Sequence, residues 1–193
     1  GDDNYNIVTE NGDFKVNKVD SAIDVAVSDI KVGEDAVISV KLASDATGEV
    51  VITVNGEDYN AAIENGVASV TVSDLKAGDY TVEVKYSGDN NYNEAAGSAE
   101  FSVLKITPDM DVFVEGTVFG GDLTVDISLP ADATGDVIIT VKGEDYILAN
   151  YTEAVVDGKV TKTIGGLDAG DYTIAVKYAG DDKYTAVEIA KGV

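Results

Sequence analysis

The chain has 193 residues, and its 45% hydrophobic content is typical of a globular protein and not of a disordered one. It carries 36 acidic residues against 13 basic ones, all of them lysine, so the net charge is −23. This charge argues against binding to nucleic acids or anionic membrane surfaces, which needs clustered Lys and Arg. Cysteine, histidine and tryptophan are absent, which removes disulfides and the commonest catalytic bases, nucleophiles and transition-metal ligands. No stretch approaches the length of apolar sequence that a membrane span needs, so we expect no membrane insertion in this segment.

Short runs rich in Val, Ile, Thr and Tyr alternate with clusters of Gly, Asp and Asn along the chain, a pattern typical of an all-β sandwich. In the first half this alternation predicts seven strands, near residues 23–27, 36–42, 49–54, 58–63, 67–72, 79–87 and 99–104. Asn65 and Gly66 predict a two-residue hairpin turn, because both positions of a type I′ turn need a positive φ. Seven strands are the number expected of an immunoglobulin-like domain.

The sequence then repeats. The block DATGEVVITVNGEDY that begins at Asp45 returns as DATGDVIITVKGEDY at Asp132, an offset of 87 with three differences in 15 positions. A second block, LKAGDYTVEVKYSGDNNY from Leu75, returns as LDAGDYTIAVKYAGDDKY from Leu167, an offset of 92. A period of this length is a whole small domain, because the units of solenoid proteins are shorter. The fold class is therefore all-β, with two tandem immunoglobulin-like sandwiches.

The repeat extends to the start of the sequence. Residues 1–6 (GDDNYN) match residues 88–93 (GDNNYN), and Phe14 and Val16 match Phe101 and Val103. We therefore divide the chain into a leading strand equivalent to the end of a preceding repeat, a first domain and a second domain, at residues 1–18, 19–104 and 105–193. The second domain is five residues longer, and the extra length around Ile147–Tyr151 predicts a bulge or a longer loop in its fourth-strand region.

Two copies of one motif point to the same element of the immunoglobulin-like fold. Gly78-Asp79-Tyr80 and Gly170-Asp171-Tyr172 each precede a predicted sixth strand and have the form of a tyrosine corner, in which the Tyr hydroxyl binds backbone just upstream. Glycine permits the tight turn before the tyrosine. Tyr80, Gly78, Tyr172 and Gly170 are accordingly predicted to be structural residues, and the alternative is a generic Gly-Asp turn.

These motifs resemble the immunoglobulin-like repeat domains of bacterial and archaeal surface proteins, in particular the adhesin-like proteins of methanogens. The matching text is LKAGDYTVEVKYSGDNNY with the later Phe101-Ser102-Val103, and ATGEVVITVNGEDY before it. The resemblance implies an extracellular, cell-surface location and a stalk or adhesin segment. It brings no catalytic residues, and we expect the chain not to be an enzyme.

Calcium is the chemical hypothesis that the sequence leaves open, although we expect no obligatory cofactor. Asp89 and Asn91 in one loop, and Asp181 and Asp182 in its repeat, offer the oxygen ligands that calcium takes. The alternative is that these residues fill turns, because Asp and Asn accept hydrogen bonds from their own backbone.

Three lysines share the inward parity of their strands, which is the requirement for an intramolecular isopeptide bond. They are Lys18, Lys105 and Lys162. The alternative, which the cost of a buried unpaired charge favours, is that these side chains reach outward at strand ends or edges.

The sequence predicts a non-catalytic extracellular structural or adhesive module, a semi-rigid stalk segment whose partners are neighbouring immunoglobulin-like repeats. One alternative is a head-to-tail filament of identical subunits, in which Phe14 and Val16 donate a strand to the second domain of a neighbour. The segment 186–190 is the internal candidate for that strand, with Val187 and Ile189 in place of Phe101 and Val103. Another alternative is a domain that binds surface glycans or proteins, with exposed tyrosines that stack on sugars.

Overall fold

The computed structural model describes residues 3–144 and 146–193, which contain fifteen β-strands and no helix. The strands of the first repeat are β1 (Asp24–Ala26), β2 (Ile30–Lys31), β3 (Ala36–Lys41), β4 (Glu49–Val54), β5 (Glu57–Ala62), β6 (Val67–Val72), β7 (Gly78–Tyr86) and β8 (Ala95–Leu104). Those of the second repeat are β9 (Asp111–Glu115), β10 (Leu123–Ser128), β11 (Asp136–Lys142), β12 (Ile147–Ala154), β13 (Lys159–Ile164), β14 (Thr173–Tyr178) and β15 (Val187–Gly192). The all-β class predicted from the sequence is confirmed.

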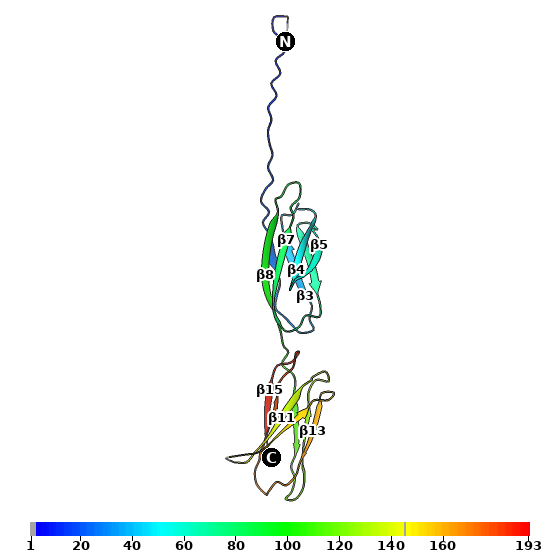
Figure 1. The fold of residues 1–193 in the computed structure, drawn as a ribbon, viewed down its shortest axis with the longest axis vertical. Helices are drawn as coiled ribbons and strands as arrows, with labels where there is room; N and C mark the ends of the chain where they lie inside the picture. The colour runs from blue at the N-terminus through cyan, green and yellow to red at the C-terminus, as the bar shows by residue number, and fades with distance from the viewer. Residues whose placement is uncertain (1–2, 145) are drawn as a thin grey trace. The chain divides into compact units, whose positions relative to one another are not determined.

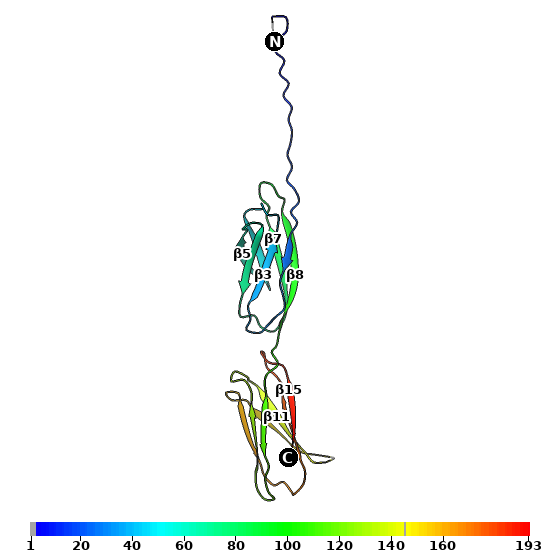
Figure 2. The same cartoon turned by 180° about the vertical axis from the view of Figure 1, so that it is seen from behind.

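The first repeat has two sheets, in the orders β1-β3-β6 and β2-β8-β7-β4-β5 (Figures 1 and 2). All seven strands predicted from the alternation are present, and β8 begins at Ala95, four residues before its predicted start. The structure adds β2, which runs parallel to the end of β8 with Ile30 opposite Val103 and Lys31 opposite Leu104. Two residues are too few for an alternating pattern, so the sequence does not signal β2.

The second repeat also has two sheets, in the orders β13-β10-β9 and β12-β11-β14-β15. Their described strands pair antiparallel throughout, with Val137 opposite Tyr178 at one end of β11 and Lys142 opposite Thr173 at the other. Within the described residues β2 has no counterpart here, so β15 lies at the edge of its sheet. The two repeats therefore differ at the strand that ends each sandwich.

The side chains that alternate inward form the core of each repeat. Val82, Val84 and Tyr86 of β7 are buried, as the sequence predicts for this face. In the second repeat both sheets contribute to one hydrophobic cluster, which includes Val125 of β10, Ile139 of β11 and Val176 of β14. Burial of such side chains from both sheets is the main favourable term in the stability of a sandwich without disulfides.

The hairpin turns have the predicted backbone conformation. Asn65 and Gly66 have φ values of 51° and 77°, and Asp157 and Gly158 have 50° and 71°. Positive φ at both central residues is the requirement of a type I′ turn. The first turn connects β5 to β6, where Glu64 pairs with Val67. The second turn connects β12 to β13, where Val156 pairs with Lys159.

The extra residues of the second repeat lengthen a hairpin. The register between β11 and β12 shifts where Val141 lies opposite Ala149 and Lys142 lies opposite Ile147, so the extra residue is Leu148 of β12, which confirms the predicted irregularity. Strand β12 has eight residues where β5 has six. The amide of Gly143 donates to the carbonyl of Tyr146 (2.9 Å) across the hairpin, whose tip exposes Tyr146, Ile147 and Leu148.

Residues 6–18 of the leading segment have the sequence of a strand, but the structure describes no strand there. Residues 6–18 form no helix or strand, and Phe14 and Val16 are 89% and 83% exposed. Val19 is bonded into the first repeat between Asn91 and Asn93: its amide donates to the carbonyl of Asn91 (2.8 Å), and its carbonyl accepts from the amide of Asn93 (2.9 Å). No helix among the described residues is long and apolar enough to cross a membrane.

Candidate functional site

The two sequence blocks that repeat most closely contact each other within each repeat. In the first repeat, residues 45–48 (DATG) meet residues 88–92 (GDNNY), and we call this contact the loop clasp. Asp89 is its centre: Oδ2 accepts from the amide (2.8 Å) and hydroxyl (2.9 Å) of Thr47, and Oδ1 accepts from the amides of Asn91 (2.8 Å) and Tyr92 (2.9 Å). One carboxylate thus joins two loops and fixes the turn in its own loop.

Two tyrosine hydroxyls complete the loop clasp of the first repeat. The hydroxyl of Tyr92 donates to Oδ1 of Asp45 (2.6 Å), and the hydroxyl of Tyr86 donates to the carbonyl of Thr47 (3.1 Å). These bonds run in both directions between the loops, because Asp89 accepts from the first loop while Tyr92 donates to it. Tyr92 therefore closes one end of the sandwich, as its recurrence in each copy indicates.

The second repeat makes the same loop clasp between residues 132–135 and residues 180–184. Asp181 accepts from the amide (2.8 Å) and hydroxyl (3.0 Å) of Thr134 with one oxygen, and from the amides of Lys183 (2.8 Å) and Tyr184 (2.7 Å) with the other. Tyr184 donates to Oδ1 of Asp132 (2.7 Å), and the buried Tyr178 donates to the carbonyl of Thr134 (2.8 Å). Conservation of this geometry between the copies explains which residues the repeat keeps.

The second loop clasp has one additional ion pair. Lys183 stands where the first repeat has Asn91, and its Nζ lies 2.6 Å from Oδ2 of Asp132. Both side chains are well exposed, so we assign this pair a small contribution to stability. The hydrogen bond from Lys183 lowers the pKa of Asp132, and that from Tyr184 lowers it further.

The hydrogen bonds of the loop clasp shift the ionisation of its members. The amide of Thr47 is the main cause that holds the pKa of Asp89 well below its usual range, and the amides of Asn91 and Tyr92 add to it. For Asp181, burial opposes ionisation, but the amides of Thr134, Tyr184 and Lys183 together hold its pKa well below the usual range. Both carboxylates are therefore ionised acceptors at neutral pH.

The four residues proposed as calcium ligands have different environments. Each oxygen of Asp89 and of Asp181 already accepts two hydrogen bonds, which fills the acceptor sites of a carboxylate. The backbone amide of Asn91 donates to Oδ1 of Asp89, and Asp182 is exposed. Residues 3–144 and 146–193 hold no group of three or more acidic side chains arranged to bind a metal. This geometry favours the turn-filling alternative, and calcium binding stays a prediction to be tested.

Removal of calcium should therefore leave the thermal stability unchanged. We expect the Tm of the full chain in EDTA and in millimolar calcium to agree within about 1 °C, because a bound ion at saturation would raise Tm by several degrees. Differential scanning calorimetry measures this difference. A clear rise with calcium that Asp182→Asn abolishes would show that the loop binds the ion.

The predicted tyrosine-corner residues lie at the turn into β7 and at its repeat. The hydroxyl of Tyr80 donates to the carbonyl of Lys76 (3.0 Å), and that of Tyr172 donates to the carbonyl of Asp168 (3.1 Å). This bond, to a backbone carbonyl four residues upstream, is the one a tyrosine corner makes. Gly78 has a φ of 153°, a conformation that disfavours side chains, whereas Gly170 is not among the glycines with positive φ.

Loss of the corner hydroxyl should have a modest cost. We expect Tyr172→Phe to reduce the free energy of unfolding by about 0.5–1.5 kcal/mol, the value of one ordinary hydrogen bond. Urea denaturation monitored by fluorescence of the remaining tyrosines measures it, with Tyr80→Phe as the matched variant in the first repeat. A loss well above this range in one repeat alone would assign that tyrosine a further role.

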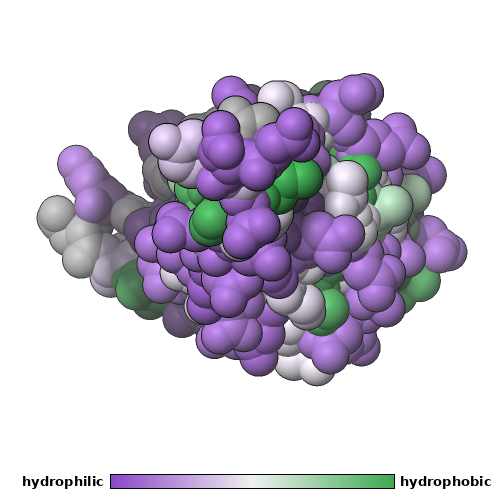
Figure 3. All heavy atoms as spheres, turned by 90° about the horizontal axis from the view of Figure 1, so that it is seen from above, coloured by the Kyte–Doolittle hydropathy of each residue, from purple (hydrophilic) through white to green (hydrophobic). Residues whose placement is uncertain are grey.

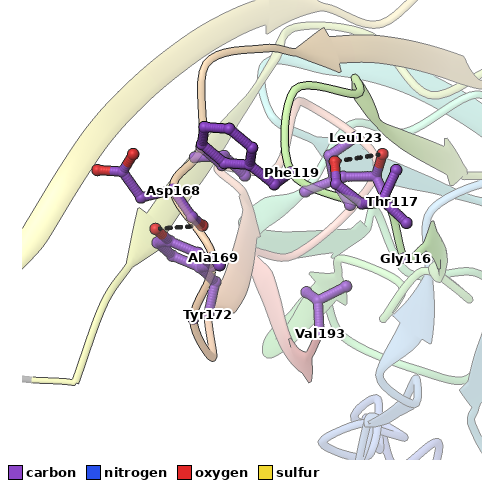
Figure 4. Close-up of a pocket in the computed structure, with 11 residues that line it drawn as sticks. Gly116, Thr117, Phe119, Leu123, Asp168, Ala169, Tyr172 and Val193 are labelled. Atoms are coloured by element: carbon purple, nitrogen blue, oxygen red, sulfur yellow. Dashed lines mark hydrogen bonds between the residues drawn. The ribbon is translucent and has the colours of Figure 1, made fainter.

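Beside the corner of the second repeat the structure has a pocket of about 230 Å³. In Figure 4 Tyr172 and Ala169 lie on one side and Thr117 on the other, with Val193 between them, and Leu167 and Phe119 also line the pocket. In the first repeat the corresponding region is filled: Phe101 and Val103 of β8 are buried, and the ring of Phe101 stacks on Tyr80 with centroids 5.3 Å apart. The pocket therefore lies beside Val193, the counterpart of Phe101.

The structure corrects the predicted alignment of the last strand. Strand β15 does occupy the final position of its sheet, but Val187 lies opposite Tyr178 and Ile189 opposite Val176. Neither takes the place of Phe101. Val193 does, because its amide and carbonyl both bond to the backbone of Tyr172 (2.8 and 3.0 Å). Val187 and Ile189 have the same alternation as Phe101 and Val103, which led to the wrong prediction. The offset of 92 from Tyr86 to Tyr178 puts Val193 at the position of Phe101.

Two of the three lysines with inward parity have polar partners. Nζ of Lys162 lies 2.6 Å from Oε1 of Glu153 and 4.6 Å from the centre of the Tyr151 ring. Nζ of Lys105 donates to the carbonyl of Asp181. Lys18 is exposed in the leading segment. Lys105 thus reaches a polar group at the surface, whereas Lys162 and Glu153 are both half-buried and satisfy each other's charge.

The loop clasp is the feature that the sequence analysis did not find. Asp89 and Asp181 were singled out for calcium, while Thr47 and Thr134 were not singled out at all. A signal was present: Thr and Asp each recur at the same position of a repeated block. The two blocks that change least between the copies are candidates for contact with each other. Two copies in one sequence do not show which residues of the blocks form the contact.

Two packed, mainly antiparallel sheets with a corner tyrosine define the class of the protein as an immunoglobulin-like sandwich, present here twice in tandem. Residues 23–104 match the model of a particular family, the bacterial Ig-like domain of group 3. This match confirms the predicted resemblance to bacterial Ig-like repeat domains. Families of Ig-like domains are generally non-catalytic.

Solved structures with similar folds come from several proteins. A segment of two fibronectin type-III domains from chicken tenascin aligns at 13% identity over 88% of this chain and 97% of that chain (TM-score 0.45). The adhesin InvE of Yersinia pseudotuberculosis aligns at 15% identity over 89% and 58% (0.41), and dimeric latent PorU of Porphyromonas gingivalis at 13% over 90% and 20% (0.38). This chain spans 20% of PorU and 58% of InvE. No curated protein matches the sequence.

Proposed function

We propose that the chain is a non-catalytic structural module of an extracellular surface protein, and that its two Ig-like repeats serve as a semi-rigid stalk segment. The observation that carries the proposal is the loop clasp. The residues that the repeat keeps, such as Asp89 and Tyr92, form hydrogen bonds with other residues of the same repeat. A module selected for its own integrity keeps such residues, whereas a binding or catalytic module keeps residues that face a ligand.

The short connection between the repeats supports the stalk. Strand β8 ends at Leu104, and Ile106 is already bonded to the carbonyl of Lys183 and to the amide of Thr185 within the second repeat (both 2.9 Å). Lys105, between them, bonds to the carbonyl of Asp181. The connection is therefore short and has no Gly/Ser-rich stretch.

The surface charge suits a protein exposed to water. The face seen in Figure 3 is largely hydrophilic, and the net charge is −23. Self-repulsion at this charge keeps neighbouring stalks soluble and apart. The family match to a bacterial Ig-like domain, of the kind found in surface adhesin-like proteins, supports an extracellular location.

Single-molecule force spectroscopy on the full chain tests the stalk. We expect two separate unfolding events, each of which lengthens the chain by roughly 25–30 nm, since a repeat of this size spans about 3.3–3.6 Å per residue when extended. A single event for the whole chain, or gradual extension without a force peak, would contradict two mechanical units. Antibodies against the chain should also label intact cells of the source organism.

The exposed hairpin tip favours binding as a second candidate function. Ile147 and Leu148 lie at the tip of the β11–β12 hairpin, in the part of the second repeat without a counterpart in the first, and Tyr146, the counterpart of Tyr59 in the repeated sequence block, is exposed beside them. An exposed aromatic side chain can stack on a sugar ring or anchor a protein contact. A glycan array with the full chain tests this candidate, with the variant Tyr146→Ser as control. Absence of binding above background leaves the stalk as the function.

A further inference from the structure

We propose that Asn150 in β12 is the attachment site of an N-linked glycan, which an oligosaccharyltransferase transfers from a polyprenyl-phosphate-linked oligosaccharide. Asn150-Tyr151-Thr152 has the pattern Asn-X-Ser/Thr, with X other than proline, that such an acceptor requires. Of the eleven asparagines in the sequence, Asn150 alone has Ser or Thr two residues later. The site rests on the extracellular location proposed above, because this transfer takes place outside the cytoplasm.

The first repeat has the same positions in its sheet without the pattern. Thr140 of β11 lies opposite Asn150, and its counterpart in the first repeat, Thr53 of β4, lies opposite Asp58. The three residues NYT of β12 therefore take the place of the three residues DYN of β5. Two changes, from Asp to Asn and from Asn to Thr, separate the two segments, and both are needed to make an acceptor.

The middle residue of the motif points inward. Tyr151 packs against the hydrophobic core of the second repeat, and Nζ of Lys162 lies 4.6 Å from the centre of its ring. Successive side chains of a strand point to opposite faces, so Asn150 and Thr152 point outward, and both are exposed. The inward tyrosine thus places both polar groups of the motif on one exposed face.

The polar atoms that the transfer needs are free. Oδ1 of Asn150 accepts from the hydroxyl of Thr140 (2.7 Å), while Nδ2 has no hydrogen-bond partner among the residues that the structure describes. The hydroxyl of Thr152 likewise has no partner in the described part of the chain. In the first repeat Asp58 accepts from Thr53 in the same way (2.6 Å). A carboxylate therefore satisfies this bond, and the fold has no use for the amide nitrogen of Asn150.

The strand that carries the motif lies at a sheet edge. Among the described strands, β12 ends the order β12-β11-β14-β15, as β5 ends the order of its own sheet. An exposed edge can pair with another chain, and charged side chains protect against this. Strand β5 exposes Glu57 and Asp58, whereas the exposed residues of β12 are uncharged and include the apolar Ile147 and Leu148. A bulky hydrophilic glycan on Asn150 protects the edge of β12 instead.

The transfer balances with the reactants named above. Nδ2 of Asn150 attacks C1 of the first sugar, and a nitrogen–carbon bond forms. The bond between C1 and the phosphate oxygen breaks, and the polyprenyl phosphate or diphosphate leaves with the electron pair. The amide gives up one proton to a base of the transferase, so the step needs neither an oxidant nor a reductant.

Mass spectrometry of tryptic peptides from the protein on cells of the source organism tests the site. Trypsin cleaves after lysine, so Asn150 lies in the peptide 143–159, where it is the only asparagine. We expect this peptide to be heavier than its sequence by the mass of one or more sugar residues. An unmodified peptide, from cells that antibodies against the chain label, overturns the site and leaves the stalk function intact. Cells without label overturn both, because the site needs that location.

Variants of the full chain, expressed in the same cells, identify the acceptor. We expect Asn150→Asp and Thr152→Ala each to abolish the added mass, whereas Thr152→Ser should retain it, because serine also supplies the hydroxyl. Asn150→Asp gives β12 the residue that β5 has at this position, so circular dichroism should be unchanged. Added mass that survives Asn150→Asp lies on another residue and overturns the site.

The first repeat allows the reverse test. The double change Asp58→Asn with Asn60→Thr builds the same motif at the same place in β5. We expect a second glycan on the tryptic peptide 42–76, whereas Asp58→Asn alone should leave that peptide unmodified. A double variant without the second glycan would overturn the inference that this motif, on the outward face of an edge strand, defines the acceptor.

Discussion

Gly158→Ala should reduce the free energy of unfolding of the second repeat by about 2–4 kcal/mol. Gly158 has a φ of +71°, and this left-handed conformation costs an L-residue roughly 1 kcal/mol. An added Cβ would also lie 2.5 Å from the carbonyl oxygen of Leu129 and 2.6 Å from that of Pro130. Both neighbours are backbone atoms, which cannot rotate away as a side chain can, so overpacking adds about 1–3 kcal/mol.

The chain contains the control that separates these two causes. Gly56 has a φ of +87°, and a Cβ there would meet nothing within 4 Å. We therefore expect Gly56→Ala to cost about 1 kcal/mol, the conformational part alone. Gly66, the counterpart of Gly158, would place its Cβ 2.5 Å from the carbonyl oxygen of Ala43 and should match Gly158. Urea denaturation of the three variants decides: equal losses at Gly56 and Gly158 would mean that the close backbone approach is unimportant.

The same turn shows what the sequence predicts well. Asn65-Gly66 and Asp157-Gly158 specify positive φ by residue type alone, and the flanking alternation fixes which faces are buried, as at Val82 and Val84. Local chemistry and period are enough for these features. The close packing that makes Gly66 and Gly158 irreplaceable was not predictable, because Ala43 and Leu129 approach them from more than twenty residues away.

Contacts between loops were the part that sequence did not predict. Asp89 and Thr47 are 42 residues apart, and no period links a loop to another loop. Asp and Asn in a Gly-rich loop have the same appearance whether they bind calcium, cap their own turn or hold a neighbouring loop. Asp89 caps its own turn and holds a neighbouring loop, which required the fold to be known. Strand β2 and the pocket beside Tyr172 were missed for a related reason, since both depend on pairing at a sheet edge.

Asp181→Asn should cost the second repeat about 1–3 kcal/mol, although it preserves the size of the side chain. The carboxylate accepts from four donors, on Thr134, Lys183 and Tyr184. An Asn side chain has one acceptor oxygen, and its NH₂ group would face two donors, which would leave them unsatisfied. The matched control is Asp182→Asn, which makes the same change of charge at the adjacent exposed residue and should stay within about 0.5 kcal/mol.

The effect of Asp181→Asn should depend on pH in one direction. The folded-state pKa of Asp181 lies below the value of about 3.9 expected for an unfolded chain. The stability that its ionisation supplies is therefore fully present above that pH, and it is lost as pH falls toward the folded-state pKa. The asparagine variant has none of this stability to lose, so its deficit relative to the wild type should shrink below about pH 4. Urea denaturation at pH 7 and pH 3 measures both deficits, and a deficit that is constant or grows in acid would mean that the charge of Asp181 does not hold the two loops together.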